Sequence, residues 1–262
     1  MLALVNTPSA PIPVELNEVP EPVPMPDEAI VEVHAFSLNR GELALLASRP
    51  EGWRPGQDVA GVIVQPAADG SGPEKGTRVA AWVDGAGWSQ RVAAPTVRMA
   101  ALPDNVSFAS AATLPVAGVT ALRTLRQGGS LLGQRVLITG AGGGVGRFAV
   151  QLAALAGAEV TGVVGNPDRA TGLSELGASA IVSKVHEAEG LFDLILESAG
   201  GASLSGVISK VAPGGTIVMF GQPVCWTCYE MKAEAYNFGK LPSFFLFFQC
   251  TPLRKFLAEK IY

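Results

Sequence analysis

The chain has 262 residues, of which 48% are hydrophobic and 16% are charged, and its net charge is −4 from 19 basic and 23 acidic side chains. This composition is typical of a globular protein with a large core, and it argues against a disordered chain or a nucleic-acid partner. No apolar run is long enough to cross a membrane, and the first residues do not resemble a signal peptide. We therefore expect no membrane partner and a cytoplasmic location.

The first part of the chain is predicted to be rich in β-structure. Short apolar runs separated by glycine and proline turns are typical of a small barrel or sandwich. The proline-rich passage 8–26 is predicted to be an extended surface loop, and His34 is predicted to lie on the solvent face of its strand. The expected strands are 2–5, 29–36, 59–64, 78–83 and 90–94, and helices are expected at 109–114 and 119–126.

Residues 130–221 alternate between strand and helix patterns. This alternation predicts an α/β fold, a doubly wound parallel sheet with helices on both faces. The length and the change of pattern place one domain at residues 1–125, a second at 126–240 and an atypical segment at 241–262. The expected strands are 136–139, 159–164, 180–182, 192–197 and 216–220, and the expected helices are 147–156, 168–176 and 202–211.

A glycine-rich turn follows the first strand of this second domain. Gly140, Gly143 and Gly146 recur at every third position, a variant of the dinucleotide-binding spacing G-x-G-x-x-G. One glycine allows a sharp turn, one allows a pyrophosphate to approach the backbone, and one allows the helix to pack closely on the sheet. The phosphates would then lie at the helix N-terminus, which favours negative charge. The alternative is a glycine-rich loop that binds no ligand.

The residues after the second strand of this domain favour NADPH over NADH. NAD sites usually carry an acidic residue at this strand end, whereas here the strand tip is neutral and Arg169 follows closely. Its guanidinium is suited to pair with a 2′-phosphate. Asp168 argues the other way, but we interpret it as the cap or first-turn acid of the next helix. Alternatively, Arg169 is a solvated surface cation.

The sequence offers few metal ligands or nucleophiles. Cys225 and Cys228 have the C-x-x-C spacing, but only Cys250 and two distant histidines, His34 and His186, accompany them. A structural zinc needs four ligands, so we expect incidental reduced thiols and no metal-binding residues. No Ser/His/Asp or Cys/His catalytic arrangement is evident.

Five stretches carry a family pattern in chain order: 37–42, 55–62, 114–121, the glycine turn and 165–170. Together they resemble the medium-chain dehydrogenase/reductase superfamily, specifically its zinc-free quinone oxidoreductase branch. The resemblance implies a GroES-like N-terminal domain, a Rossmann domain and an active site in the cleft between them. It also implies that Asn39 and Thr120 approach the nicotinamide, that Arg169 replaces a frequent lysine at the 2′-phosphate, and that Lys184 lies near the adenosine end.

Zinc-dependent members of the family differ from this chain at their ligand positions. They carry a cysteine after the early strand, and a Gly-His-Glu where this chain has Gly56, Gln57 and Asp58. Asn39 and Gln57 cannot replace a thiolate and an imidazole as zinc ligands, and the four-cysteine lobe is also missing. The resemblance therefore implies chemistry without zinc. Asp58 is interpreted as a buried carboxylate that supports loop structure.

The resemblance implies an NADPH-dependent reductase of quinones or α,β-unsaturated carbonyls. The developing oxyanion requires hydrogen-bond donors, for which Asn39 and Arg40 are the candidates, and Trp53 is a candidate to stack on a flat substrate or a simple packing residue. The expected cofactor-binding residues are Thr120, Gly140, Gly143, Gly144, Val145, Gly146, Gly165, Asn166, Arg169, Lys184, Ser198, Ala199, Phe220 and Gly221.

The family pattern fades after Gln222, and the chain ends near the point where the catalytic domain would normally be completed. We expect an edge strand near 244–248, which would offer a homodimer contact, and a helix at 251–262. Two alternatives to an active reductase follow from the shortened C-terminus. One is an NADPH-binding protein with little or no activity, and the other is a poorly folded truncation product.

Overall fold

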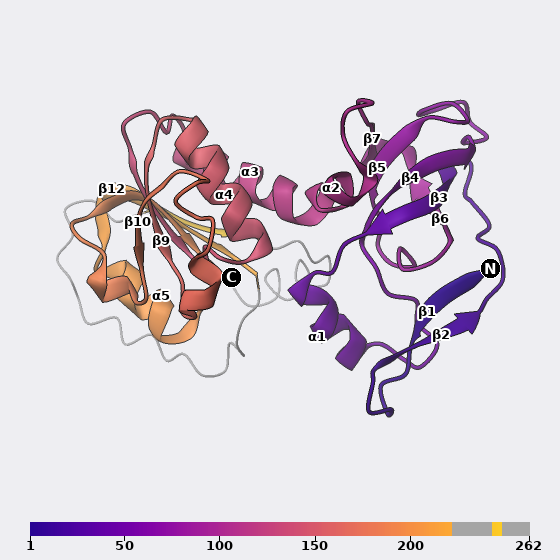
Figure 1. Ribbon diagram of the computed structural model, residues 1–262, viewed down its shortest axis with the longest axis horizontal. Helices are drawn as coiled ribbons and strands as arrows, with labels where there is room; N and C mark the ends of the chain where they lie inside the picture. The colour runs from indigo at the N-terminus through magenta and orange to yellow at the C-terminus, as the bar shows by residue number, and fades with distance from the viewer. Residues whose placement is uncertain (222–242, 248–262) are drawn as a thin grey trace, which may run out of the picture. The chain divides into compact units, whose positions relative to one another are not determined.

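The structure is a computed structural model that describes residues 1–221 and the backbone of 243–247 (Figure 1). It divides the chain into two compact units, Met1–Val119 and Thr120–Tyr262. Each unit has its own sheet and its own buried core. The domain limits that we expected from the sequence stay predictions.

The first unit contains a GroES-like antiparallel half-barrel. Its five-stranded sheet has the order β6-β3-β4-β5-β7, and β1 and β2 form a separate antiparallel pair. Alternate residues of the strands, among them Val31, Val59 and Val79, face one apolar core. The strands are β1 (Leu2–Asn6), β2 (Val14–Glu18), β3 (Glu28–Phe36), β4 (Asp58–Gln65), β5 (Arg78–Trp82), β6 (Arg91–Pro95) and β7 (Met99–Ala101).

Helices complete the first unit at two places. Helix α1 (Arg40–Ser48) follows β3, and α2 (Phe108–Ala112) packs its buried alanines against Ala60 of β4 and Ala80 of β5. A single π-helical turn, Leu114–Gly118, follows α2, and α3 (Val119–Leu125) begins at the end of this unit. The small side chains at the α2 contact allow the helix to approach the sheet closely.

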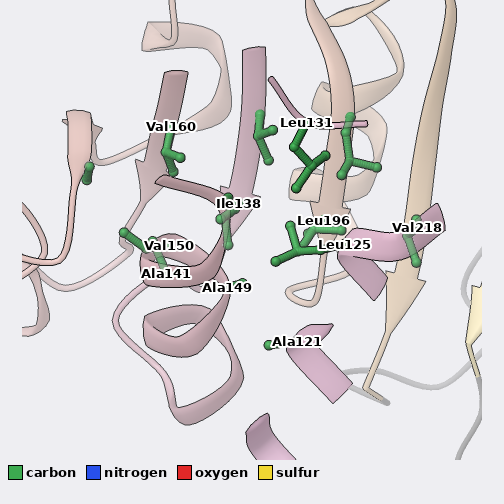
Figure 2. Packing of buried hydrophobic residues seen from close by; sticks show 14 of the residues in the cluster. Ala121, Leu125, Leu131, Ile138, Ala141, Ala149, Val150, Val160, Leu196 and Val218 are labelled. Atoms are coloured by element: carbon green, nitrogen blue, oxygen red, sulfur yellow. The ribbon is translucent and has the colours of Figure 1, made fainter. Parts of the chain in front are cut away.

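The second unit is a parallel sheet covered by helices on both faces. The order is β10-β9-β8-β11-β12-β13, and every neighbouring pair is parallel. Helix α4 (Gly144–Leu155) covers one face, where Ala149 and Val150 pack near Ile138 and Leu196 (Figure 2). Helix α5 (Gly201–Ile208) belongs to the core of the other face through Val207. The strands are β8 (Arg135–Thr139), β9 (Glu159–Val163), β10 (Ala178–Val182), β11 (Phe192–Glu197), β12 (Val211–Phe220) and β13 (Ser243–Phe247).

The fold classes predicted for both units are confirmed, but several elements differ. The predicted helix 168–176 is wrong, because the chain forms only a 3-10 turn at Pro167–Ala170 and then reaches Gly172 at φ +79°. The predicted helix 202–211 ends at Ile208, and β12 begins at Val211. The predicted loop 8–26 contains strand β2, since its residues pair with β1. The short strand β7 was not predicted.

The predicted edge strand near residues 244–248 is confirmed as β13, which pairs with β12 at the edge of the sheet. The predicted helix 251–262 and all three cysteines lie outside the described residues. His34 lies on the exposed side of β3, as predicted, and stacks on Phe108. In the part of the chain that the structure describes, no helix is both long enough and apolar enough to cross a membrane.

Candidate cofactor and substrate sites

The glycine turn joins the end of β8 to the start of α4, as the sequence predicted. Gly140 adopts φ +62°, a conformation that side chains rarely allow, and its carbonyl oxygen accepts a hydrogen bond from the N–H of Gly143 at 2.9 Å. The chain therefore reverses within four residues and enters the helix at Gly144. The first N–H groups of an α-helix have no acceptor within the helix, so this end of α4 suits an anionic group.

Close approaches to backbone atoms also explain the glycines at positions 142 and 146. A Cβ added at Gly146 would lie 2.3 Å from the carbonyl oxygen of Gly140, and one at Gly143 would lie 3.2 Å from the same atom. A Cβ at Gly142 would lie 2.5 Å from the carbonyl oxygen of Arg169. The sequence analysis did not single out Gly142, because the residue that it approaches in space, Arg169, is distant in the sequence.

Ser198 lies next to the glycine turn, so two of the predicted cofactor segments are brought together. Its N–H donates to Oγ1 of Thr139 at 2.8 Å, and its hydroxyl donates to the carbonyl oxygen of Thr139 at 3.0 Å. Its Oγ is also the atom nearest to a Cβ added at Gly140, at 2.6 Å. These contacts join the carboxyl ends of β8 and β11, the edge at which ligands bind in such sheets.

A buried carboxylate that the sequence reasoning missed supports the same edge. Glu197 is 2% exposed and accepts hydrogen bonds from the N–H groups of Ala199 (2.7 Å) and Gly200 (2.6 Å) and from the hydroxyl of Ser203 (3.0 Å). Burial raises its pKa above the ordinary value. The signal available in the sequence was an acidic residue at the end of an apolar strand, followed three residues later by the glycine pair 200–201.

Arg169 lies on the exposed 3-10 turn after β9, against the glycine turn. Asn166 caps this turn, because its Oδ1 accepts from the N–H of Asp168 at 3.0 Å. Asp168 is thus a first-turn acid and not the cap. Arg147 of α4 donates to the carbonyl oxygen of Thr171 at 2.9 Å and holds the end of the turn. Among the described residues, Arg169 forms no ion pair, so its guanidinium is available to an anion.

The remaining predicted residues of the second unit occupy varied positions. Phe220 is buried at the end of β12, and Gly221 follows it at φ +76°. Lys184 is exposed after β10, and Thr120 is buried in α3, where its carbonyl oxygen accepts from the hydroxyl of Thr124. Val145 and Gly165 lie in α4 and after β9, respectively.

In the first unit, Asn39 occupies the turn between β3 and α1 and is held by two buried carboxylates. Its Nδ2 donates to Oδ2 of Asp58 at 2.9 Å, and its backbone N–H donates to Glu42 at 2.6 Å. Asp58 and Glu42 are 0% and 1% exposed. Burial raises the pKa of Asp58 and raises that of Glu42 to about 7. The structural role predicted for Asp58 is confirmed.

The other candidates near this turn are more exposed. Arg40 is the first residue of α1 and is exposed, so a cation directly follows Asn39 in the chain. Trp53 is partly buried, and the guanidinium of Arg49 lies 5.7 Å from its ring centre. Gln57 uses its backbone N–H to donate to Glu42 at 3.0 Å. Over the described residues, no three acidic, histidine or cysteine side chains gather as a metal site would require.

The two units match two families of dehydrogenase domains in chain order. Residues 25–123 match the alcohol dehydrogenase GroES-like domain, and residues 144–237 match the zinc-binding dehydrogenase domain. A solved quinone oxidoreductase from Thermus thermophilus, also solved in complex with NADPH, is similar at a TM-score of 0.76 and 28% identity, over 99% of this chain and 84% of that chain. The CurK enoyl reductase shares the fold at a TM-score of 0.81 and 23% identity, over 99% of this chain and 83% of that chain.

Curated relatives are similar over part of their length. The chloroplast envelope quinone oxidoreductase homolog of Arabidopsis thaliana is 35% identical over 164 residues, 56% of this chain and 50% of that protein. A highly reducing polyketide synthase of Arthrinium phaeospermum is 38% identical over 157 residues, 57% of this chain but 6% of the synthase. The chain thus spans about half the length of the plant relative. From both family matches and the quinone oxidoreductases among its relatives, the chain belongs to the medium-chain dehydrogenase/reductase superfamily, in its quinone oxidoreductase and enoyl reductase branch.

Proposed function

We propose that the chain is an NADPH-dependent oxidoreductase that reduces quinones or α,β-unsaturated carbonyls by hydride transfer, without zinc. The observation that carries this proposal is the glycine turn with Arg169 against it. Gly142 and Gly146 lack room for side chains, and the cation beside them has no ion-pair partner among the described residues. The names of the relatives, quinone oxidoreductases and a polyketide synthase, support the substrate class.

The described residues fit a dinucleotide. Backbone N–H groups at the start of α4 would hold the pyrophosphate, and Gly140 and Ser198 would border it at the carboxyl ends of β8 and β11. Arg169 would pair with the 2′-phosphate, and Lys184 would lie toward the adenosine. The bound nicotinamide would supply the hydride, a chemistry that protein side chains do not provide.

The chain itself would orient the substrate and stabilise the charge that develops on its oxygen. Asn39 offers a carboxamide N–H without any ionisation, and Arg40 offers a permanent positive charge. Neither group needs to exchange a proton, so solvent would supply the final proton. The polar but non-ligating side chain of Gln57 stands where zinc-dependent relatives carry a histidine, which supports a reaction without metal.

Replacing Arg169 with alanine is expected to weaken NADPH binding by roughly tenfold or more, because a charge-assisted contact contributes about 1.5–3 kcal/mol. The affinity for NADH, which lacks the 2′-phosphate, is expected to stay nearly unchanged. Titration of the purified chain with each nucleotide, followed by nicotinamide fluorescence, measures both constants.

Arg126→Ala is the matched control, because Arg126 is an exposed arginine of the same unit on another turn. Equal losses for NADPH and NADH in Arg169→Ala would remove the 2′-phosphate assignment. Turnover of 1,4-benzoquinone and but-3-en-2-one with NADPH then tests the reaction. Tight binding without turnover of any quinone or enone would favour an NADPH-binding protein instead.

A further inference from the structure

Asp58 connects three segments of the first unit through hydrogen bonds that it only accepts. Its Oδ2 accepts from the hydroxyl of Ser37 at 2.6 Å and from Nδ2 of Asn39 at 2.9 Å, and its Oδ1 accepts from the N–H of Val116 at 2.9 Å. The side chain is fully buried at the start of β4. Three donors are directed at its two oxygens, so the site suits a carboxylate better than an amide.

The nitrogen of the Asn39 carboxamide is committed to Asp58. Asn39 is the N-cap of α1, where an asparagine oxygen commonly accepts from the backbone of the first turn. The side chain of Asn39 belongs to a capping box with Glu42, and its nitrogen donates to Asp58 at 2.9 Å. Glu42 separately holds the backbone N–H of the same residue. The side chain and the backbone of Asn39 are therefore each held by a different buried carboxylate.

We propose that Asp58 is a positioning residue: its carboxylate holds the Asn39 carboxamide with the nitrogen, and not the oxygen, directed at Asp58. This orientation determines the directions of the second N–H and of Oδ1 of Asn39. This inference rests on the proposed function, in which Asn39 binds the reacting oxygen. An amide at position 58 would keep the acceptor for Val116 only by presenting its NH2 group to Asn39. Asn39 would then have to turn its carboxamide over, which exchanges the donor and the acceptor that it offers.

The first test measures the orientation directly and needs no turnover. The side-chain amide resonances of Asn39 in the 15N-labelled chain, assigned by their loss in Asn39→Ala, are expected to move strongly in Asp58→Asn. They are expected to stay in place in Asp69→Asn, the same substitution at an exposed aspartate of this unit. Unmoved Asn39 resonances in a folded Asp58→Asn variant would overturn the proposal.

The second test measures the consequence for the reaction. With NADPH and 1,4-benzoquinone, Asp58→Asn is expected to lower kcat by about 10- to 100-fold, the usual cost of a misplaced group, and to leave the Kd for NADPH within about twofold. Adding Asp58→Asn to Asn39→Ala is expected to cause little further loss, because a residue that acts through Asn39 has nothing left to position. An equal loss in both backgrounds would mean that Asp58 acts independently of Asn39 and would overturn the proposal.

If Asp58→Asn fails to fold, its thermal melt will show it, and the double variant N39D/D58N is used instead. In this variant the NH2 group at position 58 donates to the carboxylate at position 39, so a donor again faces an acceptor. This double variant is expected to fold, to bind NADPH and to lose turnover as Asn39→Ala does. A double variant that keeps wild-type turnover would contradict the proposal. A wild type that binds NADPH but reduces neither probe would instead contradict the proposed function, and the resonance test would still decide the orientation.

Discussion

Gly146→Ala is expected to destabilise the second unit by about 1–3 kcal/mol and to raise the Kd for NADPH at least about tenfold. The new Cβ would lie 2.3 Å from the carbonyl oxygen of Gly140 and 2.7 Å from Cα of Ala141. Both obstacles are backbone atoms of the turn itself, so no side chain can move aside. The start of α4 would have to shift away from the sheet, together with the N–H groups that we assign to the pyrophosphate.

Gly165→Ala is the matched control for this change. Gly165 is a predicted cofactor residue of the same unit, but a Cβ there would meet no atom within 4 Å, and its φ is not positive. We expect its unfolding free energy to stay within about 0.5 kcal/mol of the wild type. Urea unfolding and NADPH titration measure both effects. A Gly146→Ala chain as stable as Gly165→Ala would show that the turn is not packed as the structure has it.

Glu42→Gln is expected to flatten the dependence of stability on pH. Burial raises the pKa of Glu42 from 4.5 to about 7 in the folded chain. Between these two values the folded state holds a proton that the unfolded state has lost, so the free energy of unfolding falls as pH rises. From pH 5 to pH 8 this one group should remove about 2.5 kcal/mol of stability from the wild type and nothing from the variant.

Urea unfolding of the wild type and of Glu42→Gln across this pH range gives the free energy of unfolding of each chain. The difference between the two free energies is then followed as a function of pH. Glu197 also has a raised pKa and changes stability in the same direction, but it is present in both chains and cancels. Asp58 has a raised pKa as well and interacts with Glu42 through its charge, so the difference reports Glu42 together with this interaction. Glu187→Gln is the control, because Glu187 likewise accepts from two backbone N–H groups but is exposed. A constant difference between wild type and Glu42→Gln would contradict the raised pKa.

The sequence alone determined the architecture of the second unit, because its signals are local. A β-branched run before three spaced glycines predicts β8, the turn and α4, and the alternation of strand and helix patterns predicts β11 with its observed bounds. The predicted helix 168–176 failed where local signals compete. The chain forms only a short 3-10 turn there, which ends before Gly172 adopts a positive φ.

Only the tertiary structure decided which residues support the candidate sites. The need for glycine at position 142 comes from the carbonyl oxygen of Arg169, and the orientation of Asn39 comes from Asp58. Glu42 is indistinguishable in sequence from an ordinary first-turn acid until its burial and its contact with Gln57 are known. Sequence patterns report periodic burial and turn chemistry, whereas hydrogen bonds and close approaches between distant residues exist only once the chain is folded.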